Sequence, residues 1–281
     1  MHRFKKILNT IKYSYHYLWA CYYFSDYKPQ PITIRGIINW LNQFDEKDRK
    51  IILALLHKVT YYSEKETESI IVDLNEQLLE RLEKADIPLK KVIYVQIHDP
   101  GSSSPVMLSI VRDRGRIERK GCYFIDSKNV REILETTTKL EQGAIIYVDD
   151  FAASGDQFAE AREFLAQHII GNFSEFFLLP VICEEAHSKL SRLGVEPITR
   201  TIHSKADRPL HPHSSLLDKA SKDRLIDICR QIDKRGGLGY KELATMVVFY
   251  RNSPNSLPVI LRGCVKQNPW RGILPRTTDL P

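Results

Sequence analysis

The sequence predicts an α/β protein with a mainly parallel sheet flanked by helices and an all-helical N-terminal region. Two observations support this prediction. Residues 1–88 carry apolar side chains at helical spacing. From residue 91 onward, short runs of β-branched and aromatic residues alternate with helical stretches, as in parallel sheets covered by helices. We therefore expect a helical region over residues 1–88 and an α/β domain over residues 89–281, with a C-terminal hood from about residue 236.

The N-terminal region contains three helical patterns. The first is amphipathic, and its apolar face comprises Ile7, Leu8, Ile11, Tyr15, Leu18 and Tyr22. A Tyr-rich face flanked by Lys could suit nucleic acid or a membrane surface, but aromatic stripes at helical spacing usually belong to a core, and we expect this one to do so. Asp45 can cap a second helix. The capping box of Ser63 and Glu66 opens a third helix that runs to about Lys84.

The α/β part contains six short apolar runs that predict strands. They cover residues 92–97, 122–125, 145–148, 176–182, 198–202 and 245–250. Helices are predicted between them at residues 130–140, 157–168, 184–193 and 216–234. Gly194 follows the third of these helices as a C-terminal stop. The alternation of the two kinds of element is what predicts the mainly parallel sheet.

Composition limits the class of protein. The chain has 281 residues, of which 43% are hydrophobic and 27% charged, the balance of a soluble globular protein. Its five cysteines form no CxxC pattern, so we expect neither a disulfide framework nor a zinc site, and a reducing cytoplasm fits best. No apolar run approaches the roughly 20 residues of a membrane span, and we find no signal peptide. The sequence therefore predicts a soluble cytoplasmic protein with no membrane partner.

The net charge of +6 is concentrated at the two ends of the sequence. Residues 1–28 and residues 251–281 each contain five Lys or Arg against one acid, which leaves 31 basic and 33 acidic residues between them. Basic ends suggest contact with nucleic acid, a phosphorylated ligand or an acidic partner protein. Two solvated basic ends are the alternative interpretation.

The most informative stretch is IIYVDDFAASGDQF at residues 145–158. A buried strand ends in two acids, Asp149 and Asp150, which we expect to face solvent where open α/β sheets bind ligands. The small residues that follow are Ala153, Ser154 and Gly155. They let backbone N–H groups converge at a helix N-terminus, which favours an anion such as phosphate. Because adjacent carboxylates suit a diol or a hydrated magnesium ion, the stretch predicts a sugar-phosphate site.

This stretch resembles the phosphoribosyl-pyrophosphate loop of type I phosphoribosyltransferases, in which two acids contact the ribose hydroxyls and a Thr-Gly-x-Thr turn cradles the 5-phosphate. The resemblance implies that Asp149 and Asp150 are catalytic and hold Mg²⁺ with phosphoribosyl pyrophosphate. It implies phosphate contacts from Ala153, Ser154, Gly155, Asp156 and Gln157. Two of these depart from the family pattern, because Asp156 adds a negative charge beside the phosphate and Gln157 replaces a usual hydroxyl residue.

In such enzymes an earlier loop, after the first strand of the sheet, binds the pyrophosphate through backbone amides. Here residues 98–105, HDPGSSSP, follow the first predicted strand. The residues that fit the place and the chemistry are Gly101, Ser102, Ser103 and Ser104. A small residue allows close approach, and hydroxyls donate hydrogen bonds. A plain turn is the alternative interpretation.

From about Phe44 onward the chain is similar to the phosphoribosyltransferase-like family of bacterial conflict, or antiviral defence, systems. The residues that carry this resemblance are Phe44, Asp45, Tyr61 to Ser63, Val148 to Phe151, Ser154, Gly155, Pro254 to Pro258, Trp270 and Arg276. It implies an effector in antiviral defence, beside a sensor of nucleic acid or nucleotide, and leaves the acceptor of the phosphoribosyl group open.

Several alternatives stay open at this point. The chain could transfer a phosphoribosyl group, bind the nucleotide sugar as a sensor without transfer, or bind nucleic acid or a partner protein through its basic ends. Asp149 and Asp150 could instead cap a turn or form an acidic metal pocket like that of a receiver domain. His211 and His213 could bind a metal, but spacing places no third ligand beside them, so a polar loop is the plainer interpretation.

Overall fold

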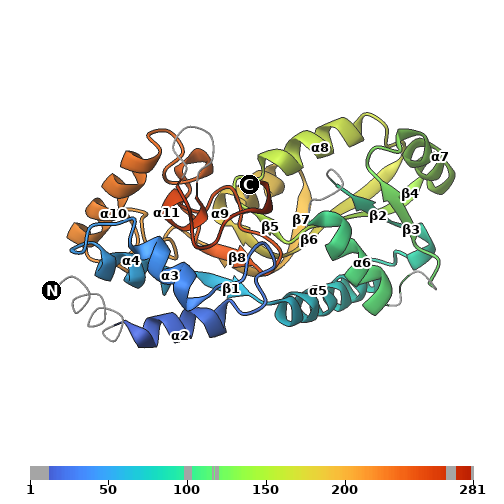
Figure 1. Ribbon diagram of the computed structural model, residues 1–281. Helices are drawn as coiled ribbons and strands as arrows, with labels where there is room; N and C mark the ends of the chain where they lie inside the picture. The colour runs from blue at the N-terminus through green and yellow to red at the C-terminus, as the bar shows by residue number, and fades with distance from the viewer. Residues whose placement is uncertain (1–12, 98–102, 116, 118–119, 264–269, 280–281) are drawn as a thin grey trace. The chain divides into compact units, whose positions relative to one another are not determined.

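The computed structural model describes residues 13–97, 103–115, 117, 120–263 and 270–279, and its chain divides into two compact units (Figure 1). The first unit combines Met1–Glu64 with Lys205–Pro281, and the second is Lys65–Ser204. This division differs from the expected boundary at residue 88. The reason is that the N-terminal helices share a hydrophobic core with the C-terminal segment.

The first unit is mostly helical. Its helices are α2 (Ser14–Tyr23), α3 (Ile34–Leu41), α4 (Arg49–Leu56), α10 (Lys219–Ile232) and α11 (Val259–Arg262), with short 3₁₀ helices at Tyr240–Glu242 and Thr277–Asp279. Side chains cap the N-termini of α3 and α10. Thr33 accepts from the Gly36 N–H at 3.0 Å, and Asp218 accepts from the Ser221 N–H at 2.9 Å. Helix α3 had no predicted counterpart.

Two short parallel strands complete this unit, β1 (Thr60–Tyr62) and β8 (Val247–Phe249). Strand β1 corrects the expectation of an all-helical N-terminal region. The strand expected over residues 245–250 does form as β8, but it pairs with β1, with Tyr61 opposite Val248, and not with the main sheet. Its partner lies nearly 190 residues away in sequence, a distance that local pattern does not reveal.

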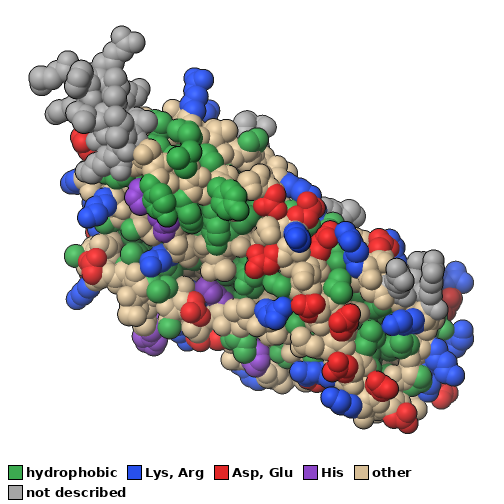
Figure 2. Space-filling view, turned by 90° about the horizontal axis from the view of Figure 1, so that it is seen from below, with side chains coloured by type: hydrophobic (Ala, Val, Ile, Leu, Met, Phe, Trp, Pro, Cys, Tyr) green, Lys and Arg blue, Asp and Glu red, His purple; other side chains and the backbone are tan. Residues whose placement is uncertain are grey.

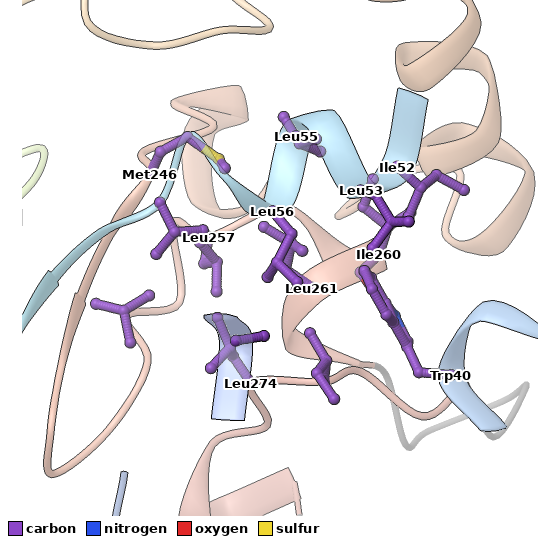
Figure 3. Close-up of a cluster of buried hydrophobic side chains, with 14 of the residues drawn as sticks. Trp40, Ile52, Leu53, Leu55, Leu56, Met246, Leu257, Ile260, Leu261 and Leu274 are labelled. Carbon is purple, nitrogen blue, oxygen red and sulfur yellow. The ribbon is translucent and has the colours of Figure 1, made fainter. Parts of the chain in front are cut away.

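The core of the first unit joins both ends of the chain (Figure 3). Trp40, Leu53 and Leu56 from the N-terminal helices pack with Ile260, Leu261 and Leu274 from the C-terminal segment. The indole Nε1 of Trp40 donates to the Ile260 carbonyl at 2.8 Å. The segment expected as a hood thus contributes to this core.

Helix α2 turns a different face to the core from the one expected. The buried residues are Tyr17, Ala20 and, just beyond the helix, Phe24. Tyr15, Leu18 and Tyr22 are 71%, 61% and 83% exposed, so our interpretation of them as core residues is wrong. The helix carries large apolar or aromatic residues on two faces, and spacing alone does not select between them. Figure 2 shows hydrophobic side chains gathered at the surface of the molecule on the side seen from below.

The second unit is a parallel sheet covered by helices. Its strands are β2 (Val92–Gln96), β3 (Tyr123–Asp126), β4 (Gln142–Val148), β5 (Phe151–Ala152), β6 (Asn172–Cys183) and β7 (Val195–His203). Its helices are α5 (Glu64–Lys84, whose first residue belongs to the first unit), α6 (Ser104–Arg114), α7 (Val130–Leu140), α8 (Asp156–Ala166) and α9 (Glu184–Arg192), with a 3₁₀ turn at Leu89–Lys91. Every strand pair is parallel, which confirms the predicted fold class.

The order of the strands is β3-β2-β4-β6, with β7 on the far side of β6 and β5 continuing past the end of β4. Helices α5 and α6 lie on one side of the sheet and α8 on the other (Figure 1). Strand β4 is buried from Gly143 to Val148, as expected of a parallel strand with both faces covered. Tyr94 donates to the Asn75 Oδ1 at 2.8 Å and so ties β2 to α5, while Phe158 of α8 stacks on Phe177 of β6.

Within the part of the chain that the structure describes, no helix is both long enough and apolar enough to cross a membrane.

Candidate functional site

The two acids lie at a break in the sheet. Strand β4 ends at Val148, opposite Leu178 of β6, and β5 begins at Phe151, opposite Val181 of the same strand. The Asp149 N–H still donates to the Leu178 carbonyl at 3.1 Å, so the backbone bends away only after Asp149. The acid pair therefore sits between two segments of one interrupted strand, with β6 continuing beside it.

Asp149 is buried, with 7% of its surface exposed, whereas Asp150 is half-buried. Oxygen Oδ1 of Asp149 accepts a hydrogen bond from the Ser103 hydroxyl at 2.5 Å and another from the Asp150 N–H at 2.9 Å. The expectation that both acids face solvent is thus wrong for Asp149. Because one oxygen of Asp149 accepts two hydrogen bonds, this carboxylate holds the segments of Ser103 and Asp150 in place as well as carrying charge.

The predicted pyrophosphate loop is described only at its end, because Gly101 and Ser102 lie outside the described residues. Ser103 precedes α6 and reaches Asp149, as stated above. Ser104 is fully buried, and its Oγ accepts from the Ile97 N–H at 3.2 Å. The Ser104 side chain thus bonds to the residue that follows β2 and does not face solvent, whereas a hydroxyl facing the ligand was expected at this position.

The small-residue turn leads into α8 as predicted. Gly155 is the residue before the helix and has φ +73° and ψ 9°, a left-handed backbone conformation that favours glycine. A Cβ atom built on Gly155 would lie 3.2 Å from both Cα and Cβ of Ala186. The turn is thus packed directly against α9. Ala153 and Ser154 are half-buried, and Gln157 is exposed on the first turn of α8.

Asp156, which departs from the family pattern, is held by two partners. Its Oδ2 accepts from the Ser154 hydroxyl at 2.7 Å, and its Oδ1 forms an ion pair with the Lys189 ammonium. The side chains of Lys189 and Asp156 are 31% and 18% exposed. Lys189 compensates the extra negative charge that the sequence places in this turn.

Lys189 was not predicted as a site residue. It lies 33 residues from Asp156, in the helix that follows β6. The available signal was topological: β6 is the neighbour of β4, so the helix after β6 begins at the edge of the sheet where the acid pair lies. Spacing in the sequence gave no reason to single out this lysine.

A polar cluster beneath the turn fixes α8 on the sheet. The Tyr147 hydroxyl donates to the Glu175 Oε2 at 2.8 Å, and Arg162 of α8 donates to both oxygens of Glu175, at 2.6 and 3.1 Å. Burial, together with the nearby Glu175 charge, raises the pKa of Tyr147 well above its ordinary value, so this tyrosine stays neutral. The hydrogen bond from Arg162 to Glu175 raises the pKa of Arg162.

The acid pair suits a magnesium ion that arrives with its ligand. Magnesium is usually held by one or two carboxylates together with substrate phosphates, and Asp149 and Asp150 supply two carboxylates. Among the residues placed by the structure, no group of three or more His, Cys, Asp or Glu could hold a metal alone. His211 and His213 likewise gain no third ligand in that part of the chain, and the His211 Nδ1 accepts from the His213 N–H at 3.1 Å.

The PRTase-CE family model matches residues 37–276, and the chain belongs to this family, which is phosphoribosyltransferase-like. Among solved structures, the orotate phosphoribosyltransferase from Aeropyrum pernix is similar over 47% of this chain and 68% of that one, with 18% identity and a TM-score of 0.31. Comparison with curated proteins found no match.

Proposed function

We propose that the second unit binds phosphoribosyl pyrophosphate with Mg²⁺ and that the protein transfers the phosphoribosyl group to an acceptor yet to be identified. One observation carries this proposal: the Ser103 hydroxyl lies 2.5 Å from Asp149. This contact joins the loop after β2, which would hold the diphosphate, to the acid pair after β4, which would hold the ribose. Family membership supports the same assignment.

The two acids have different roles in this proposal. Asp149, buried and bonded to Ser103, orients the diphosphate loop and the acid pair. Asp150 is the more exposed of the two and contacts the ribose hydroxyls. The 5-phosphate binds at the start of α8, where backbone N–H groups and the Ser154 hydroxyl can donate to it.

The reaction is a displacement at the anomeric carbon of the ribose. The bond from this carbon to the diphosphate oxygen breaks, the electron pair leaves with the diphosphate, and the acceptor forms the new bond. Positive charge develops on the ribose ring in the transition state, and the Asp150 carboxylate stabilises it. When bound, Mg²⁺ neutralises charge on the diphosphate and so makes it a better leaving group.

The test measures binding and turnover separately. Thermal unfolding of the wild type should shift upward with phosphoribosyl pyrophosphate and Mg²⁺, and release of pyrophosphate in cell extract should report transfer. The Asp149→Ala/Asp150→Ala variant should show neither response. Asp113→Ala, which removes an exposed acid from α6, is the matched control and should behave as wild type. A wild type that responds no more than the double variant would overturn the proposal.

A second function, binding without transfer, is favoured by one observation. The Asp156 carboxylate engages the Ser154 hydroxyl in the turn proposed to bind the phosphate. A negative charge at this place weakens binding of the 5-phosphate, which suits a sensor of nucleotide sugar better than a fast enzyme. Ligand-induced stabilisation without any release of pyrophosphate, in extracts that contain the acceptors of the host cell, would select this alternative.

We also propose that the protein acts in bacterial antiviral defence, as an effector beside a sensor of nucleic acid or nucleotide. This proposal rests on the sequence resemblance described above. Bacteria expressing the chain with its neighbouring genes should restrict phage plating, and the Asp149→Ala/Asp150→Ala variant should not. Equal plating on the two strains would remove the link between the site and defence.

A further inference from the structure

The ion pair between Lys189 and Asp156 occupies the turn where the proposed ligand would place its phosphate. We propose that Lys189 is a phosphate-binding residue of this site, and that Asp156 holds it in the free protein by standing in for the phosphate. This inference rests on the proposed function and adds a residue, and a rule of ligand selection, to it.

The Asp156 carboxylate is bonded by the kinds of group that bind a phosphate. One oxygen accepts from the Ser154 hydroxyl at 2.7 Å, and the other pairs with the Lys189 ammonium. Asp156 is also the first residue of α8, where the helix dipole favours negative charge. A hydroxyl donor, a cation and a helix N-terminus are together what a phosphate monoester requires. The carboxylate therefore already engages two of the donors that a phosphate would use, the Ser154 hydroxyl and the Lys189 ammonium.

The aliphatic stem of Lys189 lies beside the turn that precedes α8. A Cβ atom built on Gly155 would lie 3.5 Å from Cδ of Lys189, so the stem runs beside the turn itself. The Lys189 side chain is 31% exposed, so it is partly open to solvent. Because a lysine ammonium sits on a flexible four-carbon stem, it can pass from carboxylate to phosphate without movement of α9.

A phosphate attracts the Lys189 ammonium more strongly than the Asp156 carboxylate does, because it carries more negative charge. A phosphate monoester carries about −1.5 to −2 charges near neutral pH, against −1 for a carboxylate. Coulomb attraction at equal distance grows in proportion to that charge, so Lys189 prefers the phosphate once it is present. When the ligand has no phosphate, the Asp156 carboxylate remains the strongest anionic partner of Lys189. The pair therefore selects ribose 5-phosphate esters over unphosphorylated ribosides.

The experiment compares variants with two simple probes. Calorimetry with ribose 5-phosphate and with ribose measures how much the phosphate adds to affinity. Lys189→Met should lower affinity for ribose 5-phosphate by about tenfold, since a charged hydrogen bond is removed. Asp156→Asn should raise it by up to about fivefold, since the competing ion pair is removed. Affinity for ribose should change in neither variant, whereas a merely structural lysine would affect both probes alike.

Three further variants make the result decisive. Lys189→Arg should keep affinity for ribose 5-phosphate near that of the wild type, because the cation remains. Arg192→Met, which removes a positive charge from the same helix, should have no effect. The Asp156→Asn/Lys189→Met variant leaves no unpaired charge in the turn and so protects the fold. Its affinity should fall well below that of Asp156→Asn alone.

The outcomes separate the two proposals. If the wild type binds ribose 5-phosphate and the Lys189→Met variant binds it equally well, Lys189 is not a phosphate ligand, and the proposed function stands. If the wild type binds neither ribose 5-phosphate nor phosphoribosyl pyrophosphate with Mg²⁺, the proposed function fails, and this inference fails with it.

Discussion

Ser103 donates its hydroxyl hydrogen to Asp149 across 2.5 Å, although the two residues are 46 positions apart in the sequence. Strands β2 and β4 are neighbours in the sheet, so the segments that follow them meet at one edge. Asp149 thereby has two tasks, since its Oδ1 also accepts the Asp150 N–H. The first prediction follows from this double role.

Asp149→Ala should destabilise the protein by about 1–3 kcal/mol, because the Ser103 hydroxyl and the Asp150 N–H lose their acceptor. Asp150→Ala should change stability by less than about 0.5 kcal/mol, as is usual for a residue that is not fully buried. Both should abolish binding of phosphoribosyl pyrophosphate. Urea unfolding measures the free energy of unfolding, and Ser103→Ala provides a milder break of the same hydrogen bond. Equal losses of stability in the two acid variants would contradict the assigned roles.

Substitution of Gly155 should be costly for two separable reasons. Any side chain at φ +73° is strained by about 1–2 kcal/mol, and here it would also press on Ala186. Gly194 has the same φ of +73° but open space around a built Cβ, so Gly194→Ala is a matched control for backbone strain alone. We expect Gly155→Ala to lower the free energy of unfolding more than Gly194→Ala, and Gly155→Val to block ligand binding as well. Identical losses in the two alanine variants would mean that α9 yields to the added methyl group.

A pH dependence follows from Asp48 in the first unit. Arg224 donates to both carboxylate oxygens of Asp48, at 2.9 and 2.6 Å, and these bonds lower the pKa of Asp48 below its ordinary value near 3.8. A lowered folded pKa adds stability above the ordinary pKa, and this stability disappears as pH falls through the folded pKa. Asp48→Asn should therefore destabilise the protein at pH 7, with a smaller difference from wild type at pH 3.

Asp45 is the control for this pH prediction. Its side chain is 70% exposed and lies 3.9 Å from the same guanidinium, so Asp45→Asn should have little effect at either pH. Unfolding in urea at pH 7 and pH 3 measures both variants. A difference between Asp48→Asn and wild type that stays constant with pH would show that the charge of Asp48 is not what stabilises the unit.

The basic N-terminus is expected to serve a partner, although Arg3, Lys5, Lys6 and Lys12 lie outside the described residues. Replacing these four residues by Gln should abolish partner association or defence, and should preserve binding of phosphoribosyl pyrophosphate. For every nucleic-acid phosphate that one of these side chains neutralises, its replacement should flatten the salt dependence of binding by about one unit of slope. If a pull-down and a salt titration of this variant both match wild type, these charges serve only solubility.

Much of the second unit could be predicted because its elements are long or strongly patterned. Strands β4 and β6 and helices α7 and α9 lie close to the predicted ranges. Helix α6 was missed because residues 98–105 were interpreted as the pyrophosphate loop, whereas the helix already begins at Ser104. Proline in the first turn is a helix-start signal, so this helix was within reach of the sequence. Strand β5 has two residues, too few for any periodicity.

In the candidate site, too, some features could be predicted from the sequence and others could not. The sequence singles out Asp149, Asp150 and the turn at Gly155 as candidates because they are contiguous and chemically distinctive. Lys189 and the burial of Ser104 depend on which segments meet in space, and that is decided by the order of the strands. The sequence pattern also could not show which face of α2 packs inward, because two faces of this helix are apolar.

The assembly of the first unit from both ends of the chain sets an order of events during synthesis. The core around Trp40 and Leu56 needs Ile260 and Leu274, which leave the ribosome long after Trp40 and Leu56 do. The N-terminal helices must wait for those partners with apolar surface uncovered, while the second unit, contiguous from Lys65 to Ser204, can fold as soon as it is complete. Expression of residues 1–88 alone would keep that surface permanently uncovered, so such a fragment should aggregate, and chaperone dependence should be greatest in the interval before residue 260 is made.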